Sequence, residues 1–174
     1  MNITDYMKPV AGAIILGAAI VSTPSAAAQT HKGEKSFGPR VGYVSRNESA
    51  TAGLAFQYSF SNHLRIAPSA DIIFRHRGKD GIAVNVDMHF PITISSSSAF
   101  YPLAGFNFTS WGLHGNDADS GKDVTSHSNS VGLNAGAGIE YRCNSSLKLA
   151  LEARYTLMRH YPTAFVAASI AYVF

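Results

Sequence analysis

Two carboxylates and an arginine in the last third of the chain have the spacing of an ion-pair cluster. Glu140 lies near the end of one alternating segment, and Glu152 and Arg154 follow in the next, beyond a turn of four residues. Antiparallel strands joined by such a turn place these side chains on one face. Lys148 and Arg65 are candidates to extend the cluster. Its role is to satisfy buried charges or to act as a gate, and we expect the first, because buried charges need partners whatever the function.

A second constellation contains the residue types of a hydrolytic triad. His127 and Ser128 are followed by Glu140. Ser128 lies twelve residues before Glu140, so the two would share a face of one strand. His127 is one residue out of phase with both, and a triad needs hydrogen-bond reach between base and nucleophile. We therefore expect no catalytic residues here.

The remaining polar residues predict neither a metal site nor a cofactor site. His114, His127 and the aspartates between Gly112 and Ser128 have no spacing that fixes a coordination sphere. Cys143 is the only cysteine, which excludes an intramolecular disulfide and a zinc site built from cysteines. The net charge of +3 comes from scattered basic residues, so we expect no nucleic-acid partner.

The segments that carry these residues alternate with a period of two, which predicts strands rather than helices. From Leu147 to Leu157 one side is apolar, and the other carries Lys148, Glu152 and Arg154. Each segment is close to the roughly 9 to 11 residues that a tilted membrane strand needs. Eight such segments are expected, over residues 37–45, 53–60, 64–75, 82–90, 99–111, 131–141, 147–157 and 166–174.

The two faces of these strands favour a membrane barrel over a soluble β domain. The apolar face has large aromatics at strand ends, which is typical of an aromatic girdle at the lipid interface: Phe60, Phe74, Phe90, Tyr141, Tyr155, Tyr172 and Phe174. The other face mixes glycine and alanine with charges of both signs, which suits a packed lumen with paired charges. The expected lumenal charge network comprises Arg65, Asp71, Asp87, Glu140, Lys148, Glu152 and Arg154, with Arg75 on the same face.

The first 28 residues have the order of a secretory signal peptide. Lys8 provides a positive flank, residues 10–21 are apolar, and Pro24 then interrupts the segment. Ala26 and Ala28 form a small-x-small cleavage site before Gln29. We expect a signal peptide over 1–28 and one barrel domain over 29–174. No apolar run reaches the roughly 18 residues of a spanning helix.

The connections between the expected strands alternate in length. Ser61 to His63, Ser95 to Ser98 and Cys143 to Ser146 are short and polar, whereas Gly112 to Ser128 reads as a long hydrophilic loop. Short turns on one side and longer loops on the other are typical of outer-membrane barrels.

The sequence resembles the small eight-stranded outer-membrane proteins of the OmpX, OmpA-barrel and opacity-porin type. The resemblance is carried by FYPLAGFNF (residues 100–108), LNAGAGIEYRCNSSLKLALEARYTL (133–157) and the closing VAASIAYVF (166–174). It implies that Ile170, Tyr172 and Phe174 form the signal that the barrel-assembly machinery reads. It also implies contact with outer-membrane lipid and lipopolysaccharide. Members of the group have varied roles, so the resemblance implies the fold more firmly than the function.

We therefore expect an all-β protein, an eight-stranded antiparallel up-and-down barrel in the outer membrane of a Gram-negative bacterium. The expected role is structural or surface-interacting rather than enzymatic, with a lumen too narrow and too charged for a general diffusion pore. One alternative is a narrow or gated, porin-like barrel that conducts ions. Another is a lipid A-modifying enzyme, because some eight-stranded barrels are lipid A deacylases. The sequence does not identify an extracellular ligand.

Overall fold

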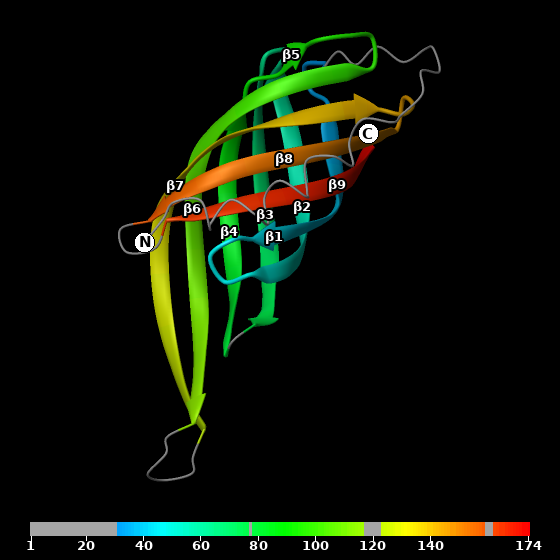
Figure 1. Ribbon diagram of the computed structural model, residues 1–174. Helices are drawn as coiled ribbons and strands as arrows, with labels where there is room; N and C mark the ends of the chain where they lie inside the picture. The colour runs from blue at the N-terminus through cyan, green and yellow to red at the C-terminus, as the bar shows by residue number, and fades with distance from the viewer. Residues whose placement is uncertain (1–30, 77, 117–122, 159–161) are drawn as a thin grey trace, which may run out of the picture.

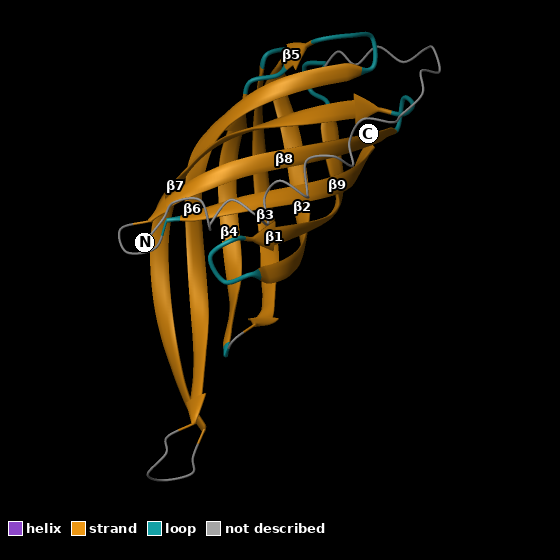
Figure 2. Cartoon of the chain, in the orientation of Figure 1, coloured by secondary structure: helices purple, strands orange, loops and turns teal. Residues whose placement is uncertain are grey.

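The computed structural model describes residues 31–76, 78–116, 123–158 and 162–174, and these ranges contain nine strands and no helix (Figure 2). Their bounds are β1 Lys35–Val44, β2 Ser49–Ser61, β3 Leu64–His76, β4 Lys79–His89, β5 Ile92–Thr93, β6 Ser98–Asn116, β7 Asp123–Arg142, β8 Leu147–Met158 and β9 Thr163–Val173. No helix in these ranges is long and apolar enough to cross a membrane.

Eight of the strands close into one antiparallel barrel, as the period-two pattern predicts (Figure 1). Each of the eight strands pairs with the next one along the chain. The two-residue β5 is not one of them, so β4 pairs with β6. The barrel closes where β1 pairs with β9, from Ser36 opposite Val173 to Val44 opposite Phe165. Backbone hydrogen bonds between Lys35 and Phe174 extend this closure to the last residue.

The barrel is inside-out relative to a soluble domain. On the outer face Val41, Ile72 and Phe106 are 62%, 57% and 66% exposed. On the inner face the charged side chains of Arg65 and Asp71 are 0% and 1% exposed. Water would not tolerate so continuous an apolar surface, whereas lipid requires it. The polar residues therefore form the interior, and the alternating apolar residues form the membrane-facing surface.

The β6–β7 hairpin extends further than the sequence indicates. The prediction of a long loop from Gly112 to Ser128 is wrong at both ends, because the two strands stay paired up to Asn116 opposite Asp123. Beyond the membrane both faces of a hairpin meet water, so it needs no alternation of apolar and polar residues there. The hairpin projects past the other strands at one end of the barrel (Figure 1).

The predicted signal peptide, with its cleavage residues Ala26 and Ala28, lies outside the described residues. At the end of the barrel where β1 begins, Asn62-His63 after β2 and Cys143 to Ser146 after β7 are short, and residues 90–97, with β5, connect β4 to β6. The opposite end also has short connections, residues 45–48 and 77–78, so the predicted alternation of short turns and longer loops holds there only for the β6–β7 hairpin. We take the hairpin end to face outside and the other end to face the periplasm, because the longest excursions of such barrels are extracellular.

Candidate functional site: the lumenal charge network

The interior of the barrel brings together ten buried charged side chains. Five are cations and five are carboxylates, so their formal charges balance among the described residues. They are Arg40, Arg65, Arg142, Lys148 and Arg154, with Glu34, Asp71, Asp87, Glu140 and Glu152.

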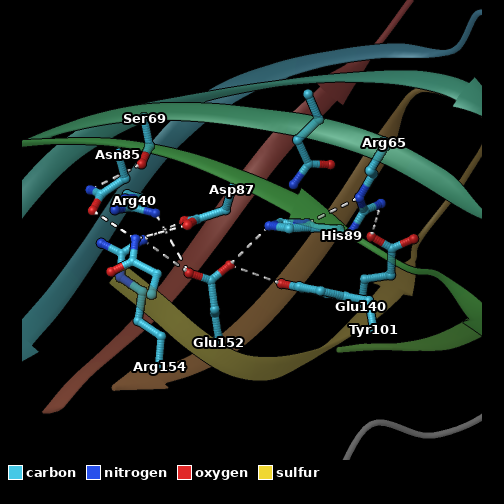
Figure 3. Close-up of polar contacts among 12 residues, drawn as sticks. Arg40, Arg65, Ser69, Asn85, Asp87, His89, Tyr101, Glu140, Glu152 and Arg154 are labelled. Carbon is cyan, nitrogen blue, oxygen red and sulfur yellow. Dashed lines mark hydrogen bonds and ion pairs between the residues drawn. The ribbon is translucent and has the colours of Figure 1, made fainter. Parts of the chain in front are cut away.

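The central cluster is organised around Arg154 of β8. Its Nη1 lies 3.0 Å from Asp87 of β4 and 3.4 Å from Glu152, and its Nη2 lies 3.6 Å from Asp71 of β3. Arg40 of β1 donates from Nε to Asp71 over 2.6 Å and lies 3.8 Å from Glu152. Two arginines are thus shared among three carboxylates contributed by three strands, so the cluster ties opposite walls of the barrel together (Figure 3).

Side-chain amides satisfy the remaining acceptors of this cluster. Asn134 donates to Asp87 over 2.8 Å, and Asn85 donates to Asp71 over 3.4 Å. Buried carboxylates need such additional donors, because an ion pair alone does not compensate for lost hydration. Further side-chain hydrogen bonds extend from these two amides. Asn107 donates to Asn85 and Thr109 donates to Asn107, while Thr156 donates to Asn134.

A second cluster fills the periplasmic end of the lumen. Arg65 of β3 donates to Glu140 of β7 over 2.6 Å, and Lys148 lies 3.8 Å from the same carboxylate. Glu34, immediately before β1, accepts from Arg142 over 2.6 Å and lies 3.6 Å from Lys148. These contacts join the first residues of the barrel to the β7–β8 hairpin across the mouth.

His89 and Tyr101 connect the two clusters (Figure 3). The rings are stacked with centroids 4.5 Å apart. Arg65 donates to Nδ1 of His89 over 3.2 Å, and Nε2 of His89 lies 3.8 Å from Glu152. The Tyr101 hydroxyl donates to Glu152 over 3.4 Å.

Glycines make room for these large side chains. Gly53 pairs with Asp71, Gly105 with Asp87, Gly136 with Arg154, and Gly138 with both Glu152 and Tyr101. A Cβ added at Gly138 would lie 2.7 Å from Cε2 of Tyr101, and one at Gly136 would lie 2.6 Å from the Cα of Arg154. The small residues of the inner face are therefore the spaces into which the charged network packs.

An apolar layer closes the extracellular end of the lumen. It is formed by Val44, Ile73, Ala83, Met158 and Phe165, all less than 9% exposed. Arg154 stacks on the Phe165 ring, with Cζ 4.3 Å from the centroid. One cavity of about 20 Å³ lies between this layer and the central cluster, and another lies beside His89 and Gln57. Each has little more than the volume that one water molecule needs.

The structure places all seven of the network residues expected from the sequence inside the barrel, but it groups them differently. Glu152 and Arg154 belong to the central cluster, whereas Glu140 pairs with Arg65 and Lys148. Arg75 is not lumenal: its side chain is 58% exposed and lies 3.7 Å from Asp80. β3 extends beyond the closed part of the barrel there, where its inner face meets solvent.

Sequence reasoning missed Arg40, His89, Tyr101, Glu34 and Arg142. The signal for Arg40 was available, since Phe37, Val41 and Tyr43 point outward and leave position 40 inside. Tyr101 was missed because an aromatic residue on a strand of this kind is expected to face lipid, whereas its side chain is buried in the lumen. Glu34 precedes the first alternating residue and gave no signal.

The catalytic constellation does not assemble. Ser128 and Glu140 lie on the same continuous strand β7. Twelve residues at about 3.3 Å each separate them by about 40 Å. Glu140 is in addition held by Arg65. Within the described residues no group of three or more His, Cys, Asp or Glu has the geometry of a metal site.

The residues expected to form the assembly signal lie on the lipid-facing side, Ile170 and Tyr172 in β9 and Phe174 directly after it. Ile170, Tyr172 and Phe174 are 52%, 59% and 62% exposed. The rings of Tyr172 and Phe174 are stacked with centroids 6.3 Å apart.

Comparison with known proteins agrees with this architecture. The model of the outer membrane protein beta-barrel domain family matches residues 12–174. The N-terminal β-barrel domain of Pseudomonas aeruginosa OprF is similar, with a TM-score of 0.68, 13% identity, and coverage of 83% of this chain and 100% of that one. Yersinia pestis Ail, the attachment invasion locus protein, is similar with a TM-score of 0.60 and 15% identity, and the match covers 82% of this chain and 99% of that one.

Neisserial surface protein A gives a TM-score of 0.62 and 14% identity, and covers 80% of this chain and 95% of that one. No curated protein matches the sequence closely enough to count as a relative. At these identities the solved structures establish the fold and leave the individual role open. The chain belongs to the outer membrane protein beta-barrel domain family, and it is a small barrel of the bacterial outer membrane with a packed, charged interior.

Proposed function

We propose that this protein is a closed, non-enzymatic barrel that anchors a surface hairpin in the outer membrane. The observation that supports this most is the packing of the lumen. An apolar layer fills its extracellular end, the central ion-pair cluster lies below it, and the cluster that includes Glu34 fills the periplasmic end. A barrel of about eight strands has an interior just wide enough for its side chains. Such an interior leaves the outward hairpin β6–β7 as the part that meets the cell's surroundings.

Planar-bilayer recording tests the closed lumen. Purified protein that has been refolded in detergent and inserted into the bilayer at neutral pH should give no steady conductance above that of the bare membrane. The reason is that the two cavities hold only about one water molecule each. The control is the double variant Arg154→Ala and Asp87→Asn, shown to be folded by heat-modifiable gel migration, which should conduct more because it removes side chains from the central cluster and leaves no unpaired charge at position 87. Steady, salt-dependent conductance of the unmodified protein would contradict the proposal.

A gated barrel is the second candidate, and one observation favours it. Four lumenal carboxylates each face two cations: Glu34 faces Arg142 and Lys148, Asp71 faces Arg40 and Arg154, Glu140 faces Arg65 and Lys148, and Glu152 faces Arg154 and Arg40. A carboxylate that moves from one cation to the other is paired both before and after the movement, so the exchange leaves no buried charge uncompensated on it. The same recordings distinguish this candidate, because exchange of partners gives brief, discrete openings rather than silence.

The partners follow from the position of the protein in the membrane. The apolar band of the outer face would contact outer-membrane lipid, including lipopolysaccharide in the outer leaflet. The β6–β7 hairpin would meet any extracellular ligand.

The closing strand would carry the signal for the barrel-assembly machinery. We expect Phe174→Ala to lower the amount of folded protein in the outer membrane severalfold, while the purified variant refolds in detergent like the unmodified protein. The physical reason is that the Phe174 side chain is 62% exposed beside the Tyr172 ring rather than packed in the core. The measurements are heat-modifiable gel migration of membrane fractions and of refolded protein, with Phe60→Ala as a matched outward aromatic. An equal loss for both variants would contradict the role as a signal.

A further inference from the structure

The short strand β5 continues β4 toward the periplasmic end of the barrel. His89 of β4 lies opposite Leu103, and Ile92 of β5 lies opposite Phe100, so both stretches keep one register along β6. A backbone hydrogen bond of 3.0 Å from the N–H of Phe90 to β6 joins the two stretches. β4, β5 and β6 therefore form a single hairpin, whose turn is the serine tract after β5.

This hairpin extends beyond the strands on its β3 side. The last pair between β3 and β4 at this end is Arg65 opposite His89, and β2 turns into β3 at Asn62-His63. Beyond that pair, β5 has β6 on one side, and no strand of the described residues pairs with its other edge. Figure 1 shows β5 at the end of the barrel opposite to the projecting β6–β7 hairpin. We call residues 90–100 the periplasmic extension.

The outward positions of the periplasmic extension remain apolar. Phe90, Ile92 and Ile94 continue the alternation of the lipid-facing side chains of β4, and the last two are 53% and 62% exposed. Phe100 lies opposite Ile92 and shares its face. The outward series of this strand runs from Ile82 to Ile94, which is thirteen residues. That is longer than the roughly 9 to 11 residues that a tilted spanning strand needs.

The extracellular hairpin differs where it leaves the membrane. Its outward pairs change from Phe108 opposite Val131 to Ser110 opposite Asn129, although the two strands stay paired. A hairpin with water on both faces needs no apolar alternation. The periplasmic extension keeps its alternation, so its outer face requires an apolar environment.

The free edge of β5 favours lipid over a protein strand as that environment. The N–H groups of Phe90 and Ile94 donate to β6, so the alternate residues of the ladder direct their backbone groups to the free edge. Pro91 is one of these and has no N–H, which leaves Thr93 as the donor that an added strand could use. Residues 90–100 also contain no charged side chain, so they offer a protein partner no charge complementarity.

We propose that the periplasmic extension is a lipid-binding surface: Phe90, Ile92, Ile94 and Phe100 enter the phospholipid leaflet on the periplasmic side, and the serine turn lies among its headgroups. Continuity of register and of exposed apolar side chains with the membrane-facing surface of β4 supports this assignment. In the turn, the Ser95 hydroxyl accepts from two backbone N–H groups, which suits a polar but uncharged boundary. The apolar band is therefore taller on this side, and the inference does not depend on whether the lumen is closed.

Spin labelling tests the position of the periplasmic extension. Labels are attached at Ile92→Cys or Ile94→Cys in a Cys143→Ser background, because Cys143 is the only native thiol. The refolded protein is placed in dioleoylphosphatidylcholine vesicles, with a water-soluble nickel complex on both sides of the membrane. Both labels should be accessible to dissolved oxygen and severalfold less accessible to the nickel complex than a label at Ser145→Cys, in the exposed β7–β8 turn. Val86→Cys, on the outer face of β4, gives the reference for a lipid-facing site.

Two outcomes of this experiment would overturn the proposal. If the nickel complex reaches positions 92 and 94 as readily as position 145, the extension lies in water and its apolar face awaits a periplasmic protein. If both reagents are excluded from these positions, a second copy of the chain covers them instead of lipid.

Bilayer thickness gives an independent measurement on the same protein. The double variant Ile92→Ser and Ile94→Ser should lower the ratio of folded to unfolded protein by about a hundredfold in dioleoyl vesicles, the factor expected when two aliphatic side chains lose their burial. The loss should be smaller in the thinner dilauroyl bilayer, because the hydrocarbon there no longer reaches the extension. An equal loss in both bilayers would show that the apolar band is not taller on this side.

Discussion

Replacing Arg154 with alanine should destabilise the refolded barrel by about 3 to 5 kcal/mol, which is the cost of removing one partner of a buried charge cluster. Arg154 is 4% exposed and lies within 3.6 Å of three carboxylates. Without it, Asp87 loses its arginine, and the arginine contact that remains to Glu152 is the 3.8 Å one with Arg40, beside the Tyr101 hydroxyl and His89. The measurement is the free energy of unfolding in lipid vesicles, from denaturant titration monitored by gel migration and tryptophan fluorescence.

An exposed arginine on the same barrel provides the matched control. Arg75 is 58% exposed and lies 3.7 Å from Asp80, so Arg75→Ala should change the free energy of unfolding by less than about 1 kcal/mol. Adding Asp87→Asn to Arg154→Ala should restore part of the loss, because an amide leaves no unpaired charge. Equal effects of the two single substitutions would show that the lumen is hydrated and that its charges are screened.

The sequence could predict the barrel because the membrane imposes a simple rule on every strand. From Leu147 to Leu157 each odd position must satisfy lipid and each even position must satisfy the lumen, so the pattern reveals the faces. The same rule placed Asp71, Asp87 and Glu140 inside. It requires nothing of the parts beyond the bilayer, which explains why the outer half of the β6–β7 hairpin read as a loop.

The partners of each charge could not be predicted, because they depend on how the strands close and stagger. Glu140 and Arg65 are 75 residues apart and meet only across the closed lumen. Arg142 and Glu34 are 108 residues apart and meet only because β1 pairs with β9. Alternation shows which side of the wall a residue is on, and it does not show the height or the opposite strand.

Space in the lumen is as decisive as charge, and the glycines provide it. Asp87 pairs with Gly105 across the sheet, and a Cβ at that position would lie 2.6 Å from the Cα of Asp87 and still closer to the Val86 carbonyl oxygen. Backbone atoms on the neighbouring strand cannot rotate away as a side chain can. Any side chain at position 105 therefore pushes β4 and β6 apart or drives Asp87 out of the cluster.

Gly105→Val should consequently abolish folding or cost more than about 3 kcal/mol, because overpacking and the loss of the Asp87 contacts to Arg154 and Asn134 act together. Ala104→Val, one residue earlier, points to lipid and should fold normally, which gives a control in the same strand. Both are measured by heat-modifiable migration after refolding. If Gly105→Val folded as stably as Ala104→Val, the lumen would have to contain free volume near Asp87. The packed interior, and with it the closed barrel, would then be wrong.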